Sequence, residues 1–317
     1  METRTQLTQN SIAAGEVIRA LLHGLIDYAG LFPPASLGMS AAVANYDAYS
    51  RCEVNWMLGR FIVPVARLGE FEEAVGRMPP GQTEAHWSLS ALPGADLSAD
   101  LGRIREFNDR FAASPSARRI RIESIEVKIA SAEEIERLSE LIPPKTETYF
   151  EIPWAAEASG EMRDCIAEVS RGGRRAKIRT GGETADKFPA PERVVEFIRL
   201  CAASNVPFKA TAGLHHPVRS RHRLTYQVDS PSAIMHGFLN VFLAAVFLRA
   251  GVHARFAIEL LNEQAAAAFH FDSNGVLWRD HRLGLADVST ARRNFAISFG
   301  SCSFTEPVDD LRALGLL

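Results

Sequence analysis

Apolar, β-branched segments alternate with amphipathic helical segments from about residue 10 to the end of the chain. Strands that alternate with helices form a parallel sheet with helical crossovers. The pattern predicts eight strands, each followed by a helix, which is the arrangement of a closed (β/α)8 TIM barrel of the α/β class. The predicted strands cover residues 25–32, 60–65, 86–91, 120–129, 148–153, 175–182, 207–214 and 294–303.

The regular spacing is broken once, between the seventh and eighth predicted strands. Residues 217–293 form an insertion with an apolar helix over 233–250 and an Ala-rich helix over 254–268. We find no internal repeat or linker, so residues 1–317 are expected to form one barrel domain that carries this helical insertion. Because an apolar helix must bury its surface, we expect the insertion to cover the barrel mouth. The other predicted helices cover residues 11–23, 38–51, 69–77, 97–112, 131–142, 159–171, 190–203 and 306–314.

Two neighbouring strands each carry one lysine at the same place, Lys177 in RAKIRTGG and Lys209 in PFKATAGL. Side chains alternate along a strand, so Lys177 shares a face with Arg179, and Lys209 shares a face with Thr211. Burial and like-charge repulsion both favour a neutral amine, so we expect a lowered pKa for at least one lysine. A neutral lysine is a nucleophile for carbonyl carbon. Alternatively, both lysines reach solvent or pair with acids.

Polar residues gather at the predicted strand ends, where barrel enzymes hold their catalytic groups. Unpaired buried ions cost several kcal/mol each, so this set predicts a functional cavity at the mouth. The set comprises Asp27, Glu126, Lys128, Glu151, Lys177, Arg179, Lys209, Thr211, His215, His216 and residues 301–303.

The order of these motifs resembles that of the deoxyribose-phosphate aldolase family of class I aldolases. The likeness spans most of the chain outside the insertion. It rests on Ile26-Asp27 in the first strand, Ile62-Val63-Pro64 in the second, Glu126 in the fourth, Lys177-Ile-Arg-Thr-Gly181 in the sixth, Lys209-Ala-Thr-Ala-Gly213 in the seventh and Gly300-Ser-Cys-Ser303 in the eighth. The chain resembles more closely a group of bacterial proteins without an assigned activity that share the motifs IDxAxxFPP, KxRTGG, GLHHPVR and FGSCSxxEP.

The aldolase resemblance implies that Lys177 forms a Schiff base, that Lys209 lowers its pKa, and that Glu126 relays protons with Asp27 nearby. We predict a substrate-binding set of Glu151, Arg179, Thr211, Gly213, His215, His216, Gly300, Ser301 and Ser303. The chain departs from the family where Glu126 replaces an aspartate, where Arg179 replaces a small residue, and where Leu214-His215-His216 interrupts a phosphate-binding loop.

Three other interpretations use overlapping residues. A metal-dependent enzyme would use Glu151, His215 and His216, with Asp27 or His236, to hold a divalent ion. A non-catalytic protein would bind an anion with Lys177, Arg179 and Lys209. Cys302 could act as a nucleophile with His215 as its base, although a small buried cysteine is the commoner case. We expect neither a resident metal nor a cofactor.

Composition limits the partners and the compartment. Lys and Arg number 35 against 38 Asp and Glu, a net charge of −3, and no basic run fits nucleic acid. The polar N-terminus lacks a signal-peptide core, the apolar run 238–248 is too short to span a bilayer, and the four cysteines lack disulfide or zinc spacing. We expect a cytoplasmic protein with an anionic or carbonyl small-molecule substrate. Helix 233–250 could instead form a homodimer interface or pack on the barrel, and its sequence fits both.

Overall fold

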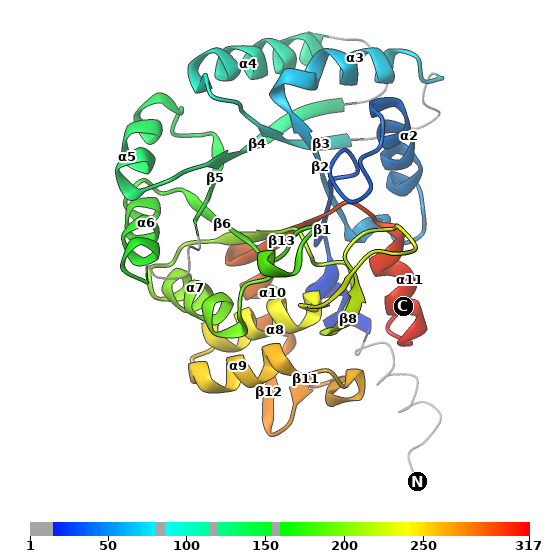
Figure 1. Cartoon of the computed structure of the whole chain (residues 1–317), viewed down its shortest axis with the longest axis vertical. Helices are drawn as coiled ribbons and strands as arrows, with labels where there is room; N and C mark the ends of the chain where they lie inside the picture. Colours follow the sequence, from blue (N-terminus) through cyan, green and yellow to red (C-terminus); the bar gives the residue numbers. More distant parts are fainter. Residues whose placement is uncertain (1–14, 80–85, 114–118, 154–158) are drawn as a thin grey trace.

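The protein is a closed barrel of eight parallel strands surrounded by helices (Figure 1). The computed structural model describes residues 15–79, 86–113, 119–153 and 159–317. The strands follow the order β1-β13-β7-β6-β5-β4-β3-β2, and β1 pairs with β2 to close the barrel. This confirms the (β/α)8 TIM-barrel prediction. The barrel strands are β1 (Ile26–Tyr28), β2 (Leu58–Pro64), β3 (His86–Leu92), β4 (Arg119–Lys128), β5 (Glu147–Glu151), β6 (Arg175–Arg179), β7 (Phe208–Thr211) and β13 (Ala296–Ser301).

The predicted helices around the barrel are present with shifted ends. Helix α5 begins as the sequence predicts, because the Ser131 hydroxyl accepts a hydrogen bond from the Glu134 backbone N–H. Of the helix predicted over 11–23, residues 15–22 are helical and 11–14 lie outside the described residues. The helices are α2 (Met39–Ser50), α3 (Leu68–Gly76), α4 (Leu97–Ala113), α5 (Ala132–Leu141), α6 (Ser159–Arg171), α7 (Pro191–Ala203), α8 (Phe238–Arg249), α9 (Ala254–Asn262), α10 (Leu285–Asn294) and α11 (Thr305–Ala313); 3-10 turns are η1 (Asn55–Met57), η2 (Val65–Arg67), η3 (Ala185–Lys187) and η4 (Ala266–Ala268).

Strand register places charged side chains next to one another inside the barrel. Lys128 on β4 pairs with Glu151 on β5, Glu151 pairs with Lys177 on β6, and Lys177 pairs with Lys209 on β7. Residues paired across a sheet point to the same face, so these side chains project together. The interior of β4 to β7 is therefore ionic, unlike the branched apolar layers that fill most such barrels.

The apolar segment of the insertion is a barrel crossover helix. Helix α8 is buried along its length up to Leu248, and the Phe242 ring lies 6.4 Å from Phe208 on β7 and 5.9 Å from Phe299 on β13. The prediction of one helix over 233–250 was wrong at its start, since residues 232–235 form strand β9. Because α8 is covered by its own chain, it cannot serve as a homodimer interface. Within the described ranges, no helix is long and apolar enough to cross a membrane.

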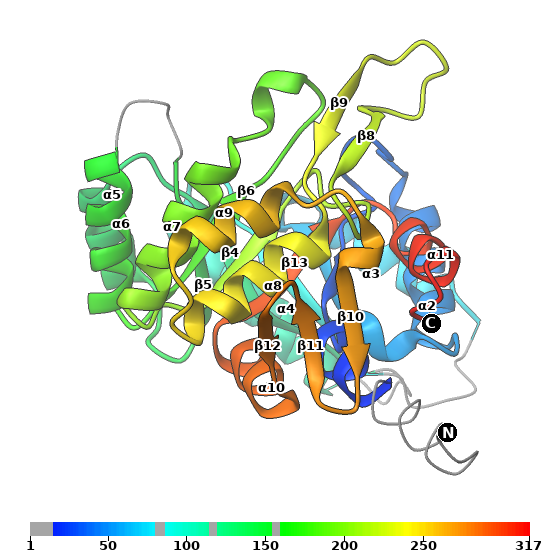
Figure 2. The same cartoon turned by 90° about the horizontal axis from the view of Figure 1, so that it is seen from below.

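The rest of the insertion is partly strand and extends toward opposite ends of the molecule (Figure 2). Strands β8 (Ser220–Arg223) and β9 (Ser232–Met235) form a hairpin, from which Leu224 and Met235 line the barrel cavity. Strands β10 (Phe269–Asp272), β11 (Gly275–Trp278) and β12 (His281–Leu283) project the other way. The predicted Ala-rich helix ends as α9 at Asn262. The expected cover over the mouth is thus limited to the β8–β9 hairpin.

Candidate active site

A cavity of about 840 Å³ opens at the carboxyl end of the barrel strands. Its wall is built from the last residues of the strands and the loops that follow them, which is where such barrels hold their catalytic groups. Apolar side chains from the β1 loop and from the β8–β9 hairpin complete it. The polar and glycine lining comprises Glu126, Lys128, Glu151, Lys177, Arg179, Gly182, Glu183, Thr184, Lys187, Lys209, Thr211, Gly213, His215 and Gly300.

From the cavity downward, cations and carboxylates alternate along a chain of ion pairs. Arg179 Nε lies 3.4 Å from Glu151 Oε1, and Glu151 Oε2 lies 2.7 Å from Lys177 Nζ. Glu126 stands between the two lysines, with Oε2 2.8 Å from Lys177 Nζ and Oε1 2.6 Å from Lys209 Nζ.

At the lower end of this chain, Lys209 Nζ lies 2.5 Å from Asp27 Oδ2. Asp27 also accepts hydrogen bonds from the Ser298 hydroxyl at 2.7 Å and from the Arg60 backbone N–H at 2.7 Å. Asp27 does not line the upper cavity; it is one layer below it. The structure therefore brings Asp27, Glu126, Lys177 and Lys209 together, with Glu151 and Arg179 nearest the opening.

A β-bulge turns Glu126 toward the lysines. Leu89 pairs with Ile122 but Ser90 pairs with Ser124, so Glu123 is an extra residue in β4. Before the bulge, Ile122 belongs to the apolar core; after it, Ser124 and Glu126 bond to the Ser90 hydroxyl in the interior. A one-residue slip exchanges the two faces of a strand, so this bulge decides that Glu126 points inward.

Charged neighbours set the pKa values of the groups in this series of ion pairs. Burial alone would lower the pKa of Lys209, but the Asp27 and Glu126 carboxylates outweigh burial and raise it. Burial likewise disfavours ionised Glu126, yet Lys177 and Lys209 hold its pKa well below the usual range. The pKa of Glu151 is also lowered, because Lys177 overcomes its burial. The expectation of a lowered pKa is therefore wrong for Lys209, and the pairing of both lysines with acids matches the alternative interpretation.

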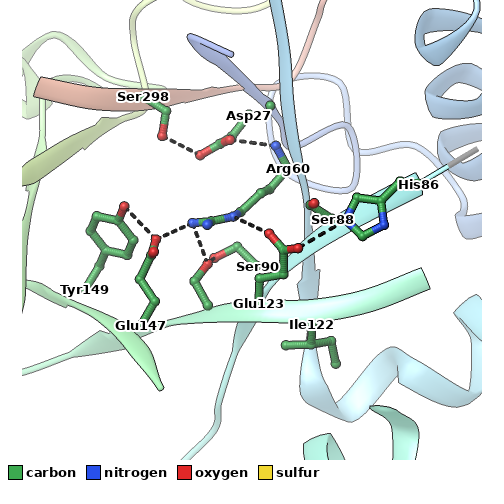
Figure 3. Close-up of polar contacts among 12 residues, drawn as sticks. Asp27, Arg60, His86, Ser88, Ser90, Ile122, Glu123, Glu147, Tyr149 and Ser298 are labelled. Carbon is green, nitrogen blue, oxygen red and sulfur yellow. Dashed lines mark hydrogen bonds and ion pairs between the residues drawn. The ribbon is translucent and has the colours of Figure 1, made fainter. Parts of the chain in front are cut away.

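Beneath Asp27 lies a second polar cluster, which the sequence analysis did not identify (Figure 3). Arg60 Nη1 contacts Glu147 Oε1 at 2.5 Å and the Ser124 hydroxyl at 3.1 Å, and Arg60 Nε lies 3.7 Å from Glu123. Asp27, Arg60 and Glu123 line a separate cavity of about 390 Å³. The available signal was the alternation of Glu147, Tyr149 and Glu151 along β5, which marks one polar face.

Glycines let the loops after β6 and β7 approach each other above the lysines. A Cβ on Gly181 would lie 2.8 Å from the Gly213 Cα and 2.6 Å from the Phe188 ring. Gly213 also has a φ of +74°, which favours glycine. The Thr180 hydroxyl donates to the carbonyl of Ala212 at 2.7 Å and joins the same two loops. The TGG and TAG segments therefore shape the rim.

Three members of the predicted substrate-binding set do not line the cavity. His216 bonds to Asp310 at 2.6 Å and stacks on His222. The Ser301 hydroxyl accepts a hydrogen bond from the Ser303 backbone N–H, and the Ser303 hydroxyl accepts one from the Glu306 backbone N–H. These serines support the start of helix α11. Glu151, Arg179, Thr211, Gly213, His215 and Gly300 do line the cavity.

The residues proposed as metal ligands are separated. His215 bonds to Glu306, and His236 Nε2 bonds to the Pro189 carbonyl. Within residues 15–79, 86–113, 119–153 and 159–317, no group of three or more His, Cys, Asp or Glu side chains is placed to hold a metal ion. Among the described residues, the geometry therefore supplies no ligand set for the metal-dependent interpretation.

No protein-family model matches the chain, and no curated protein matches it. A solved structure with some similarity is the crystal structure of RipC from Yersinia pestis, at 12% sequence identity and a TM-score of 0.30. The match covers 65% of this chain and 90% of that chain. A likeness at this level carries no information about function.

Proposed function

We propose that this protein is a Schiff-base, class I aldolase-like lyase that acts on a small carbonyl compound through an imine at Lys177. The observation that carries the proposal is the position of Lys177 and Lys209 in register on adjacent strands, joined by Glu126 beneath an open cavity. A lysine amine adds to carbonyl carbon when an adjacent group takes its proton. The order of sequence motifs that resembles class I aldolases supports the same chemistry.

Lys177 is better suited than Lys209 to form the imine. Both line the cavity, but the Lys209 side chain is 1% exposed and is held by Asp27 and Glu126 at the inner end of the chain. Lys177 is bound by Glu151, whose side chain is 12% exposed and lies toward the opening. A substrate that enters from the mouth meets Glu151 and Lys177 before Lys209.

The neighbouring carboxylates supply the proton transfers. Glu151 or Glu126 accepts a proton from the Lys177 ammonium, and the free Nζ then forms a bond to the carbonyl carbon while the carbonyl oxygen takes up a proton. Loss of water from the carbinolamine leaves the imine. A neighbouring carboxylate then takes the proton of the substrate's β-hydroxyl, the Cα–Cβ bond breaks, an aldehyde leaves, and the protonated imine becomes an enamine on Lys177. The enamine regains a proton at Cα, and water hydrolyses the imine to release the second product and the free lysine. In this mechanism Lys209 acts through Glu126, whose charge it stabilises.

An anionic substrate is favoured by the charges around the mouth. Lys128, Arg179 and Lys187 line the cavity in addition to the two inner lysines, against Glu126, Glu151 and Glu183. This excess of cations also suits the second candidate, a non-catalytic anion-binding protein. The two candidates differ in one property, because only the lyase forms a covalent adduct on lysine.

We also propose a cytoplasmic location and a small-molecule partner. All four cysteines are free, which fits a reducing compartment. The homodimer stays a prediction, and its interface would have to lie outside α8.

Borohydride reduction with short aldehydes and keto acids, followed by peptide mass mapping, tests the imine. We expect an adduct on the peptide that contains Lys177. Lys177→Met should abolish it, while Lys187→Met, a matched change at the cavity rim, should retain it. Adducts on no lysine, or adducts that persist unchanged in Lys177→Met, would reject the lyase and leave anion binding.

A further inference from the structure

A second group of reactive side chains lies in the wall of the same cavity, formed by Cys302, His215 and Glu306. Cys302 follows β13, His215 lies in the loop after β7, and Glu306 is in the first turn of α11. His215 Nδ1 is 2.9 Å from Glu306 Oε2, and His215 Nε2 is 4.0 Å from Cys302 Sγ. The Tyr226 hydroxyl, from the β8–β9 hairpin, is 3.5 Å from the same sulfur.

This arrangement favours a thiolate beside an imidazolium. Glu306 accepts the Nδ1–H of His215, which leaves Nε2–H directed at the sulfur. Burial alone would lower the pKa of His215, but Cys302 and Glu306 raise it to about 10. Burial alone would raise the pKa of Cys302, but His215 lowers it, and the backbone N–H of Ala35 adds a further donor.

The other cysteines provide a contrast within the same chain. Cys165 and Cys201 are buried among apolar residues, and burial raises the pKa of Cys165 to about 11 and that of Cys201 well above its usual value. Cys52 is half-buried and pairs with no other cysteine. Among the four, Cys302 alone combines a cavity position with an adjacent histidine and carboxylate in the described part of the chain.

We propose that Cys302 is a second nucleophile of the cavity, which adds reversibly to small aldehydes. The Cys302 sulfur forms a bond to the carbonyl carbon, the C=O π bond breaks, and the oxygen takes the Nε2 proton of His215 to give a thiohemiacetal. The reaction needs no other reactant. Glu306 is a positioning residue that orients the imidazole. The inference does not depend on imine formation at Lys177.

Alkylation by iodoacetamide tests the thiolate, because the S–C bond forms as the C–I bond breaks and iodide leaves. An unperturbed thiol is only a few per cent ionised at neutral pH, so lowering the pKa of a thiol increases the fraction that is reactive. Part of this gain is offset, because a thiolate with a low pKa is a weaker nucleophile. We therefore expect Cys302 to be labelled about tenfold faster than Cys52, by peptide mass mapping. His215→Gln should remove this advantage at Cys302 and leave the rate at Cys52 unchanged.

If the His215→Gln variant unfolds, the buried Cys165 and Cys201 will also be labelled faster, which makes the unfolding visible. In that case Glu306→Gln replaces it, and the rates at Cys302 and Cys52 are compared in the same way. Equal rates at Cys302 and Cys52 in the native protein, or a Cys302 rate that neither variant slows, would overturn the thiolate pair.

The aldehyde step is tested in Lys177→Met, in which the imine cannot form at position 177. Glycolaldehyde should slow the alkylation of Cys302, and the matched diol ethylene glycol should not. Unchanged labelling in the presence of glycolaldehyde, or equal protection by both compounds, would overturn covalent addition at Cys302. Failure of borohydride trapping at Lys177 would leave this result untouched, so the two hypotheses fail separately.

Discussion

Replacing Glu126 by Gln tests the central feature of the barrel, the carboxylate shared by two buried lysines. The side chain of Glu126 is 3% exposed, and it contacts Lys177 at 2.8 Å and Lys209 at 2.6 Å. A glutamine keeps the volume, but its amide NH₂ must face one of the ammonium groups. Removing one partner from a buried ion pair costs about 3–5 kcal/mol. Each lysine keeps a second carboxylate, Glu151 or Asp27, so we expect a loss of about 3 kcal/mol, at the low end.

The pH dependence gives this prediction a sign. The pKa of folded Glu126 is lowered, so its contribution to stability is present above the unfolded pKa, about 4.3, and is lost as the pH falls toward the folded pKa. The difference in unfolding free energy between the native protein and Glu126→Gln should therefore shrink below about pH 4.

Urea denaturation followed by circular dichroism, at neutral pH and at stepwise lower pH, measures this difference. Glu73→Gln is the matched control, because Glu73 forms an exposed ion pair with Arg77. The stability of this variant should be nearly that of the native protein. A cost below about 1 kcal/mol for Glu126→Gln, or a difference that stays constant through acid pH, would refute the shared-carboxylate argument.

Three further substitutions have defined outcomes. Lys209→Met should destabilise the fold by about 3–5 kcal/mol in urea denaturation, because Asp27 and Glu126 lose a common partner, whereas Lys187→Met should not. Gly213→Ala should lower the stability by about 1–3 kcal/mol, because φ is +74° at this position. Gly102→Ala in α4, where nothing lies close to the added Cβ, should raise the stability by up to about 1 kcal/mol, and thermal melting measures both changes. Asn240→Ala should lower the stability by about 2 kcal/mol or more by the same measurement, because the buried amide bonds to three backbone groups. A loss of stability no larger than that of the exposed control Asn262→Ala would contradict this.

The sequence determined the eight barrel strands, most of the helices around them and the inner face of β6 and β7. Periodicity located β4 to within a residue at each end and β6 within the lysine segment, because alternation and turn residues are local properties. It also indicated that Lys177, Arg179, Lys209 and Thr211 face one space, which the register of β6 and β7 confirms. The helix predicted over 131–142 matches α5 (Ala132–Leu141) to within a residue at each end.

Tertiary structure decided which charges meet. Asp27 and Lys209 are 182 positions apart and touch only because β1 closes the barrel beside β13. Glu126 reaches both lysines because a bulge at Glu123 reverses the faces of β4, and a single extra residue leaves little trace in a sequence pattern.

The division of the insertion also required the tertiary structure. An apolar stretch such as 238–248 reads alike whether it packs on a barrel, a lid or a second subunit, and burial against Phe208 and Phe299 settled the choice. The contacts of Cys302 with His215 and Glu306 also required the tertiary structure, because Cys302 follows β13 and His215 follows the neighbouring strand β7. Local propensity specifies elements, whereas contacts between distant residues depend on register and packing, which periodicity does not encode.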